Sequence, residues 1–213
     1  MLYLHQIQLY EVTMSFPFTN QNSNLSDCWL SFINGDKDAF SEFYNQSYNM
    51  LYSYGMGLGL ESQKIRDIIH DIFVRLYVNP DLINDSSTLK PFLLRSVRNA
   101  FLNLKKIENR YTDLDQVDFD LKYSVVTNDT EALETQEHIE YQVNNILSAL
   151  TPRQKEIIYL RFMHQMDYGE ISQIMSLSEQ AARNLLHRAI TKARDNGNSK
   201  ELLVLIILCV HIY

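Results

Sequence analysis

"MDYGEISQIMSLSEQAARNLLHRAI", residues 166–190, contains a short amphipathic segment, a tight break and a longer amphipathic segment. Asp167 and Glu170 have the spacing of a capping box, which predicts that a helix begins at "YGEISQIM". Ser176–Ser178 form the break, and the apolar spacing of residues 178–194 predicts a second helix. The apolar stripe expected on that helix consists of Ala181, Leu185, Leu186, Ala189 and Ile190. Two helices joined by a tight turn are typical of a DNA-reading helix-turn-helix.

In such a motif the first turns of the second helix enter the major groove. The side chains that we expect to reach upstream DNA there are Ser178, Glu179, Gln180, Arg183, Asn184, His187, Arg188 and Lys192. Of these, Arg188 and Lys192 lie nearer to the phosphates. A helical bundle with a solvated basic face is the alternative interpretation of this stretch.

The residues on the N-terminal side of the motif also predict helices. Thr151-Pro152 is an N-cap followed by proline at the first helical position. Residues 38–106 hold three stretches with apolar residues at helical spacing, and Asn79-Pro80 ends the second of them. In the third, Arg95, Arg98, Lys105 and Lys106 are expected to point away from the core.

The charge of the chain is concentrated in one segment. The net charge is −7, but residues 107–146 carry 10 acidic and 2 basic residues, a charge of −8, so the rest sums to +1. The flanking segments can therefore carry basic faces. This acidic segment has no sustained period and predicts a flexible linker.

The composition places limits on the class of protein. Cys28 and Cys209 lie near opposite ends without partners at metal spacing, which favours a reducing, cytoplasmic protein. Residues 202–210 are apolar throughout, about half the length of a spanning helix, so we expect a terminal strand or helix covering a groove, or a patch for a partner. The N-terminus lacks the features of a signal peptide, and Met14 is an alternative start.

The two helical parts together resemble a known family. "AFSEFYNQSYNMLYSYG…IRDIIHDIFVRLYVNPD…LKPFLLRSVRNAFLNLKK" resembles region 2 of bacterial sigma factors, and "LSALTPRQKEIIYLRFMHQMDYGEISQIMSLSEQAARNLLHRAITKAR" resembles region 4. In this order and size they are similar to the extracytoplasmic-function (ECF) sigma factors. The resemblance implies an all-α fold of two small helical domains joined by an acidic linker. The expected divisions are an N-terminal extension (1–24), a region 2-like domain (25–106), the linker (107–139), a region 4-like domain (140–196) and an apolar tail (197–213).

The resemblance also implies roles for particular residues. Asp67 and Asp71 would face arginines of the clamp helices of core RNA polymerase, with Ile69 and Phe73 packing nearby. Residues implied to bind and open the minus-ten DNA are Asn84, Ser86, Ser87, Thr88, Arg95, Arg98, Asn99, Lys105 and Lys106. The implied function is a sigma factor that binds core polymerase through its clamp helices and flap, recognises and melts promoter DNA, and directs transcription initiation.

Three departures from the family pattern concern the helix-turn-helix. Ser172 stands in the first helix, where the family often has alanine, and Ser176 stands at the turn, where it often has glycine. Ala181-Ala182 replaces a usual hydroxyl residue followed by valine. A sigma factor placed by a separate DNA-bound recruiter is therefore one alternative. A dimeric helix-turn-helix regulator that binds duplex DNA without polymerase is another. The promoter, the regulon and an anti-sigma partner are left open.

Catalysis is not expected from this chain. It has no glycine-rich phosphate loop, no nucleophile elbow and no Cys/His set at metal spacing, and its histidines are scattered. We therefore expect no enzyme activity, no cofactor, no metal and no small-molecule substrate.

Overall fold

The computed structural model describes residues 22–108, 119–121, 141 and 143–196, and every regular element in these ranges is helical. This confirms the predicted all-α fold class. The main helices are α1 (Asn22–Ile33), α2 (Lys37–Gly57), α3 (Ser62–Val78), α4 (Leu89–Glu108), α6 (Pro152–Ile158), α7 (Tyr168–Met175) and α8 (Glu179–Asn196). Shorter elements are the 3-10 turns η2 (Pro80–Leu82) and η3 (Ser86–Thr88), the π-helical η4 (Tyr159–Met163) and a helix over residues 143–148. The predictions for the N-terminal extension, most of the acidic linker and the apolar tail lie outside the described residues.

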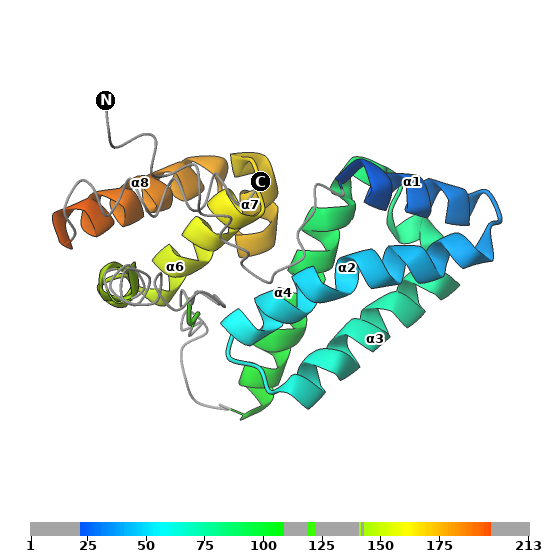
Figure 1. Cartoon of the computed structure of the whole chain (residues 1–213), viewed down its shortest axis with the longest axis horizontal. Coiled ribbons are helices and arrows are strands. Elements are labelled where there is room, and N and C mark those ends of the chain that lie inside the picture. The colour runs from blue at the N-terminus through cyan, green and yellow to red at the C-terminus, as the bar shows by residue number, and fades with distance from the viewer. Residues whose placement is uncertain (1–21, 109–118, 122–140, 142, 197–213) are drawn as a thin grey trace, which may run out of the picture.

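Helices α1 to α4 form an N-terminal bundle around an aromatic core (Figure 1). Trp29 of α1 and Phe43 of α2 are fully buried with ring centroids 5.2 Å apart, and Phe73 of α3 lies 5.3 Å from Phe43. Helix α3 ends at Val78, directly before the predicted Asn79-Pro80 stop. Tilted aromatic rings at these separations favour a well-ordered core. Packing in this core fixes the positions of α3 and α4, and so of their exposed faces.

The C-terminal helices α6, α7 and α8 form a second group (Figure 1). The predicted cap at the start of α6 is confirmed, since the Thr151 side chain accepts a hydrogen bond from the backbone of Gln154 and the Gln154 side chain accepts one in return. The apolar stripe of α8 differs from our expectation. Its buried residues are Ala182, Leu186, Ala189 and Ala193, whereas the expected Ala181, Leu185 and Ile190 are only half-buried. The small alanines bring α8 close to its neighbours, so the side chains that flank this stripe remain partly exposed.

Helix α4 lies between the two groups, with α2 and α3 on one side and α7 on the other (Figure 1). Because it has neighbours on both sides, it buries a wide arc that includes Leu93, Leu94, Val97 and Phe101. Arg98 lies within this arc and is only 5% exposed, so the expectation that its side chain points away from the core is wrong. A single-face pattern underestimates the buried arc of a helix that packs on two partners.

Part of the acidic linker packs against the N-terminal bundle. The linker was expected to be an unpatterned tether, but Phe119 is buried, and a Cβ added at Gly57 would stand 2.8 Å from its ring. The Asp120 amide donates a hydrogen bond of 2.7 Å to the Gly57 carbonyl. Residues 119–121 are therefore anchored where α2 ends. Among the described residues, no helix is long and apolar enough to cross a membrane.

The turn between α7 and α8 uses a left-handed backbone conformation. Ser176 has φ 54° and ψ 53°, and its amide and that of Leu177 both donate to the Ser172 carbonyl. This geometry satisfies the last carbonyl groups of α7, but a residue with a Cβ adopts it at a cost of about 1–2 kcal/mol. The predicted break is confirmed, with serine in a conformation that favours glycine.

We expect Ser176→Gly to raise the free energy of unfolding by about 0.5–1 kcal/mol, because glycine removes the Cβ strain and loses part of this gain as chain entropy. Thermal unfolding of the full chain, followed by circular dichroism, measures the change. Ser172→Gly is the matched control, since the same replacement inside α7 should lower stability by about 1 kcal/mol. A Ser176→Gly protein less stable than wild type would contradict the argument.

Candidate functional site

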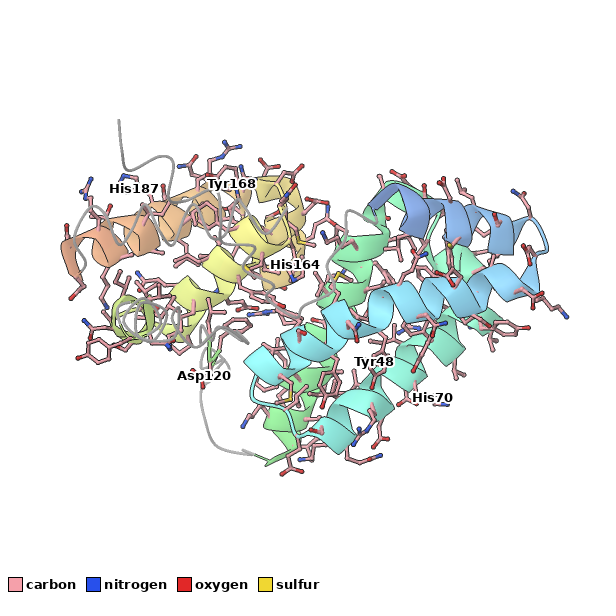
Figure 2. All side chains as sticks on the ribbon, in the orientation of Figure 1. Tyr48, His70, Asp120, His164, Tyr168 and His187 are labelled. Atoms are coloured by element: carbon pink, nitrogen blue, oxygen red, sulfur yellow. The ribbon has the colours of Figure 1, made fainter. Side chains whose placement is uncertain are left out.

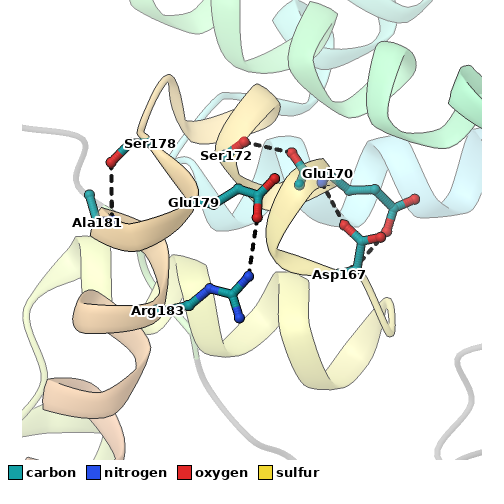
Figure 3. Close-up of polar contacts among 8 residues, drawn as sticks. Asp167, Glu170, Ser172, Ser178, Glu179, Ala181 and Arg183 are labelled. Atoms are coloured by element: carbon teal, nitrogen blue, oxygen red, sulfur yellow. Dashed lines mark hydrogen bonds and ion pairs between the residues drawn. The ribbon is translucent and has the colours of Figure 1, made fainter.

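The helix-turn-helix is held by capping interactions at the start of both helices (Figure 3). The Glu170 amide donates to the Asp167 carboxylate at 2.8 Å and the Asp167 amide donates to the Glu170 carboxylate at 2.8 Å. At the second helix, the Ala181 amide donates to the Ser178 hydroxyl at 3.2 Å. These local bonds set where α8 begins, and so which of its residues lie in the first two turns.

All the side chains predicted to contact upstream DNA are exposed in this structure. They are Ser178, Glu179, Gln180, Arg183, Asn184, His187, Arg188 and Lys192. The side of α8 that could enter a groove is therefore open, while the opposite side packs against α6 and α7. Its contact with DNA remains a prediction.

Arg183 already has partners on the protein. Its guanidinium lies 3.1 Å from the Glu179 carboxylate (Figure 3) and 4.7 Å from the centre of the Tyr168 ring. Gln180 and Asn184 share a side-chain hydrogen bond of 3.1 Å. An exposed pair four residues apart on a helix is worth about 0.3–0.5 kcal/mol, so these side chains can exchange partners at little cost.

The loop predicted to capture a minus-ten base has an internal hydrogen-bond network. The Asp85 carboxylate accepts hydrogen bonds from the Ser87 amide and the Ser87 hydroxyl, and these bonds lower the pKa of Asp85. The Thr88 hydroxyl donates to the Asp85 carbonyl at 2.7 Å. Ser86 is half-buried and Asn84 is exposed. The loop therefore has a defined shape before any DNA arrives.

The candidate DNA residues of α4 fall into two groups. Asn99, Lys105 and Lys106 are exposed and Arg95 is half-buried. All four side chains are therefore accessible, which a DNA-binding surface requires. Arg98 is not on that surface in this conformation, because its Nε donates to the Glu156 carboxylate at 2.9 Å and both side chains are buried. The structure does not bring Arg98 together with the other predicted minus-ten residues.

The candidate polymerase surface on α3 divides in a similar way. Asp67 and Asp71 are exposed, and Asp67 accepts a hydrogen bond from Gln63 at 3.0 Å. Ile69 is fully buried and Phe73 is 3% exposed, so both belong to the core of the N-terminal bundle. The two carboxylates are accessible to a partner, whereas Ile69 and Phe73 pack into the core and fix the position of α3.

The described residues contain no group of three or more His, Cys, Asp or Glu side chains placed to hold a metal ion. His70 is exposed on α3 and His187 on α8, far apart on the molecule (Figure 2).

Comparisons with known proteins show which proteins this chain resembles. The family model described as "Sigma-70, region 4" matches residues 141–192. The "ECF RNA polymerase sigma factor SigM" of Bacillus subtilis (strain 168) is 27% identical over 149 residues, covering 70% of this chain and 88% of that protein. The "RNA polymerase sigma-E factor" of Streptomyces avermitilis is 23% identical over 169 residues, covering 79% and 90%. The chain is thus similar to ECF-type sigma factors over most of its length, and to sigma-70 region 4 over residues 141–192.

The fold of this chain also has a solved counterpart. The structure described as "Structure of CnrH in complex with the cytosolic domain of CnrY" aligns with a TM-score of 0.50 and 16% identity, over 80% of this chain and 94% of that chain. The region 4 match begins before α6 and ends within α8, so it contains α6, α7, the turn and most of α8. The match thus covers the surface that the sequence singled out.

Sequence reasoning missed a buried polar cluster between the two groups of helices. The Tyr54 hydroxyl donates to the same Glu156 oxygen at 2.7 Å, and Lys90 donates to the His164 carbonyl at 2.8 Å. A signal was present, since Arg98 stands four residues after Leu94 and three before Phe101, both fully buried. That spacing places Arg98 on a buried face of α4.

His164 lies at this junction (Figure 2). Burial, together with the nearby positive charge of Lys90, lowers the pKa of His164 from 6.5 to about 3. Its ring packs edge-on against Tyr159 at 4.8 Å. The folded protein therefore keeps this imidazole neutral at a pH where the unfolded chain would protonate it.

We expect the free energy of unfolding to fall as pH drops below about 6.5, because His164 then binds a proton in the unfolded chain but stays neutral in the folded protein. The loss between pH 7 and pH 5 should be about 2 kcal/mol. Urea unfolding of wild type and His164→Leu at both pH values measures it, and His164→Leu should lose the smaller amount. His70→Gln, which changes an exposed histidine, serves as the control and should keep the wild-type pH dependence. Equal pH dependence in all three proteins would contradict the assignment.

Proposed function

We propose that this chain directs transcription initiation by binding core RNA polymerase, recognising promoter DNA and helping to open it. The observation that carries the proposal is the region 4 match over a helix pair whose predicted DNA-contact residues are all exposed. In this proposal the chain catalyses nothing itself, and the polymerase carries out the chemistry. It acts in the cytoplasm, where polymerase and promoter are found.

Contact with polymerase would come mainly through α3. Asp67 and Asp71 are four residues apart and both exposed, so their carboxylates lie on adjacent turns of one face. Carboxylate–guanidinium pairs are directional and charge-assisted, which suits docking onto arginine-bearing helices of the large polymerase subunit. The flap of the same subunit would hold the C-terminal helices.

Promoter opening would use the loop before α4 and α4 itself. Asn84 offers an exposed amide to a base edge, while Lys105 and Lys106 offer charge to phosphates. Preferential binding of the unpaired strand needs no nucleotide hydrolysis. An anti-sigma factor is a further partner, a proposal supported by a structural relative whose printed description is a complex with the cytosolic domain of CnrY.

We expect the wild-type chain to co-elute with purified core RNA polymerase, and the double variant Asp67→Arg, Asp71→Arg to lose this binding, because reversed charges would repel the arginines. The control double variant Asp38→Arg, Glu42→Arg makes the same charge change at the same spacing on exposed positions of α2. It should still bind. Failure of the wild type to bind would favour a dimeric regulator that binds duplex DNA alone.

Promoter reading by α8 makes a second prediction, tested with the assembled holoenzyme. Asn184→Ala should cost about 1–3 kcal/mol of binding and relax the preference at one base pair, because the amide would contact a base edge. Lys192→Ala should weaken binding to all sequences equally and lower the salt dependence by about one counterion. Selection of bound sequences at two salt concentrations distinguishes the effects, and uniform weakening by both variants would contradict the assignment of Asn184.

A further inference from the structure

Glu156 connects the two groups of helices through a buried charge. Its Oε1 accepts hydrogen bonds from Tyr54 of α2, 102 residues away, and from Arg98 of α4, 58 residues away. The carboxylate is completely buried and the Arg98 side chain is 6% exposed. We call these three residues the interdomain latch.

The interdomain latch is incompletely satisfied. The second carboxylate oxygen, Glu156 Oε2, is buried and has no hydrogen-bond partner in the described part of the chain. A buried ion pair repays its desolvation only when the remaining lone pairs are also bonded, and a pair of apolar residues is often as stable. Contact between the two groups of helices is thus specific but not strong.

Aromatic rings cover the interdomain latch. Phe119 lies 6.0 Å from the Tyr54 ring and 5.4 Å from the Tyr159 ring, and the Tyr54 and Tyr159 rings stack at 6.1 Å. Phe119 comes from the acidic linker, so one segment closes over a junction made by the helices on either side of it. Exclusion of water by these rings strengthens the ion pair as long as they stay in place.

Arg98 cannot serve DNA while the junction is closed. It is the one predicted minus-ten cation with a buried side chain, whereas Lys105, Lys106 and the α3 carboxylates Asp67 and Asp71 remain exposed. A guanidinium binds carboxylate and phosphate with the same donor geometry, so the two anions are direct competitors for it.

We propose that the interdomain latch holds the free sigma factor in a closed state, and that separation of the two groups of helices on polymerase transfers Arg98 from Glu156 to a promoter phosphate. This inference rests on the proposed function. The α3 carboxylates are exposed in the closed state, but binding to polymerase through α3 and the C-terminal helices together requires the open state, so the closed state lowers the apparent affinity.

The test compares full-length variants by small-angle X-ray scattering and by equilibrium binding to core polymerase without DNA. Glu156→Gln should expand the radius of gyration and tighten polymerase binding about tenfold, because it leaves Arg98 buried without a counter-charge. Lys90→Met removes the bond to the His164 carbonyl together with the charge of Lys90, leaves the Glu156 bonds in place, and should give a smaller change of the same sign. Circular dichroism verifies that each variant keeps its helices.

Two controls separate opening from general damage. Glu61→Gln makes the same chemical change on an exposed residue without a side-chain cap bond, and should match wild type in both measurements. The double variant Arg98→Met, Glu156→Met replaces the ion pair with apolar side chains, and should restore the compact radius and the weaker binding.

Unchanged radii in both Glu156→Gln and Lys90→Met would overturn the inference and leave polymerase binding, and so the proposed function, intact. Expansion without tighter polymerase binding would overturn the link between opening and polymerase. Absence of polymerase binding by the wild type would instead reject the proposed function, and the radii would still show whether these residues hold the two groups together.

Discussion

A carboxylate removed from water must find positive charge or hydrogen-bond donors, and this constraint organises the centre of the molecule. Glu156 is completely buried, and Tyr54 and Arg98 supply its donors from helices that are distant in sequence. Loss of either donor would leave charge in a dry interface, where it is far more costly than at the surface. The position of α6 against α2 and α4 therefore depends on a few polar bonds as well as on apolar packing.

The same junction explains the protonation states around it. Burial raises the pKa of Tyr54 well above its usual value, with the negative charge of Glu156 adding to the effect. Burial lowers the pKa of Lys90, although Glu170 partly opposes this change. The free-energy cost of burying these polar side chains is offset only while the two groups of helices stay together. A junction of this kind can therefore close specifically and still open.

The helix-turn-helix, in contrast to this junction, is specified almost wholly by local interactions. Caps at Thr151 and Asp167 and the break at Ser176–Ser178 were readable from residue types and spacing, and the structure has each of them. Its exposed residues were also predicted correctly as exposed, since the polar side of an amphipathic helix faces water unless something else covers it. The family match over residues 141–192 then gave this surface its context.

The sequence by itself determined the all-helical class, the starts of α6 and α7, the end of α3 and the polar sides of α3 and α8, because caps, turns and apolar periods act within a few residues. Only the tertiary structure decided the environment of Arg98, the burial of Glu156 and the docking of Phe119. These depend on which helices become neighbours, and a helix with two neighbours buries residues that a single-face pattern assigns to solvent. Arg98, which the sequence placed among the candidate DNA residues, is for that reason buried against Glu156.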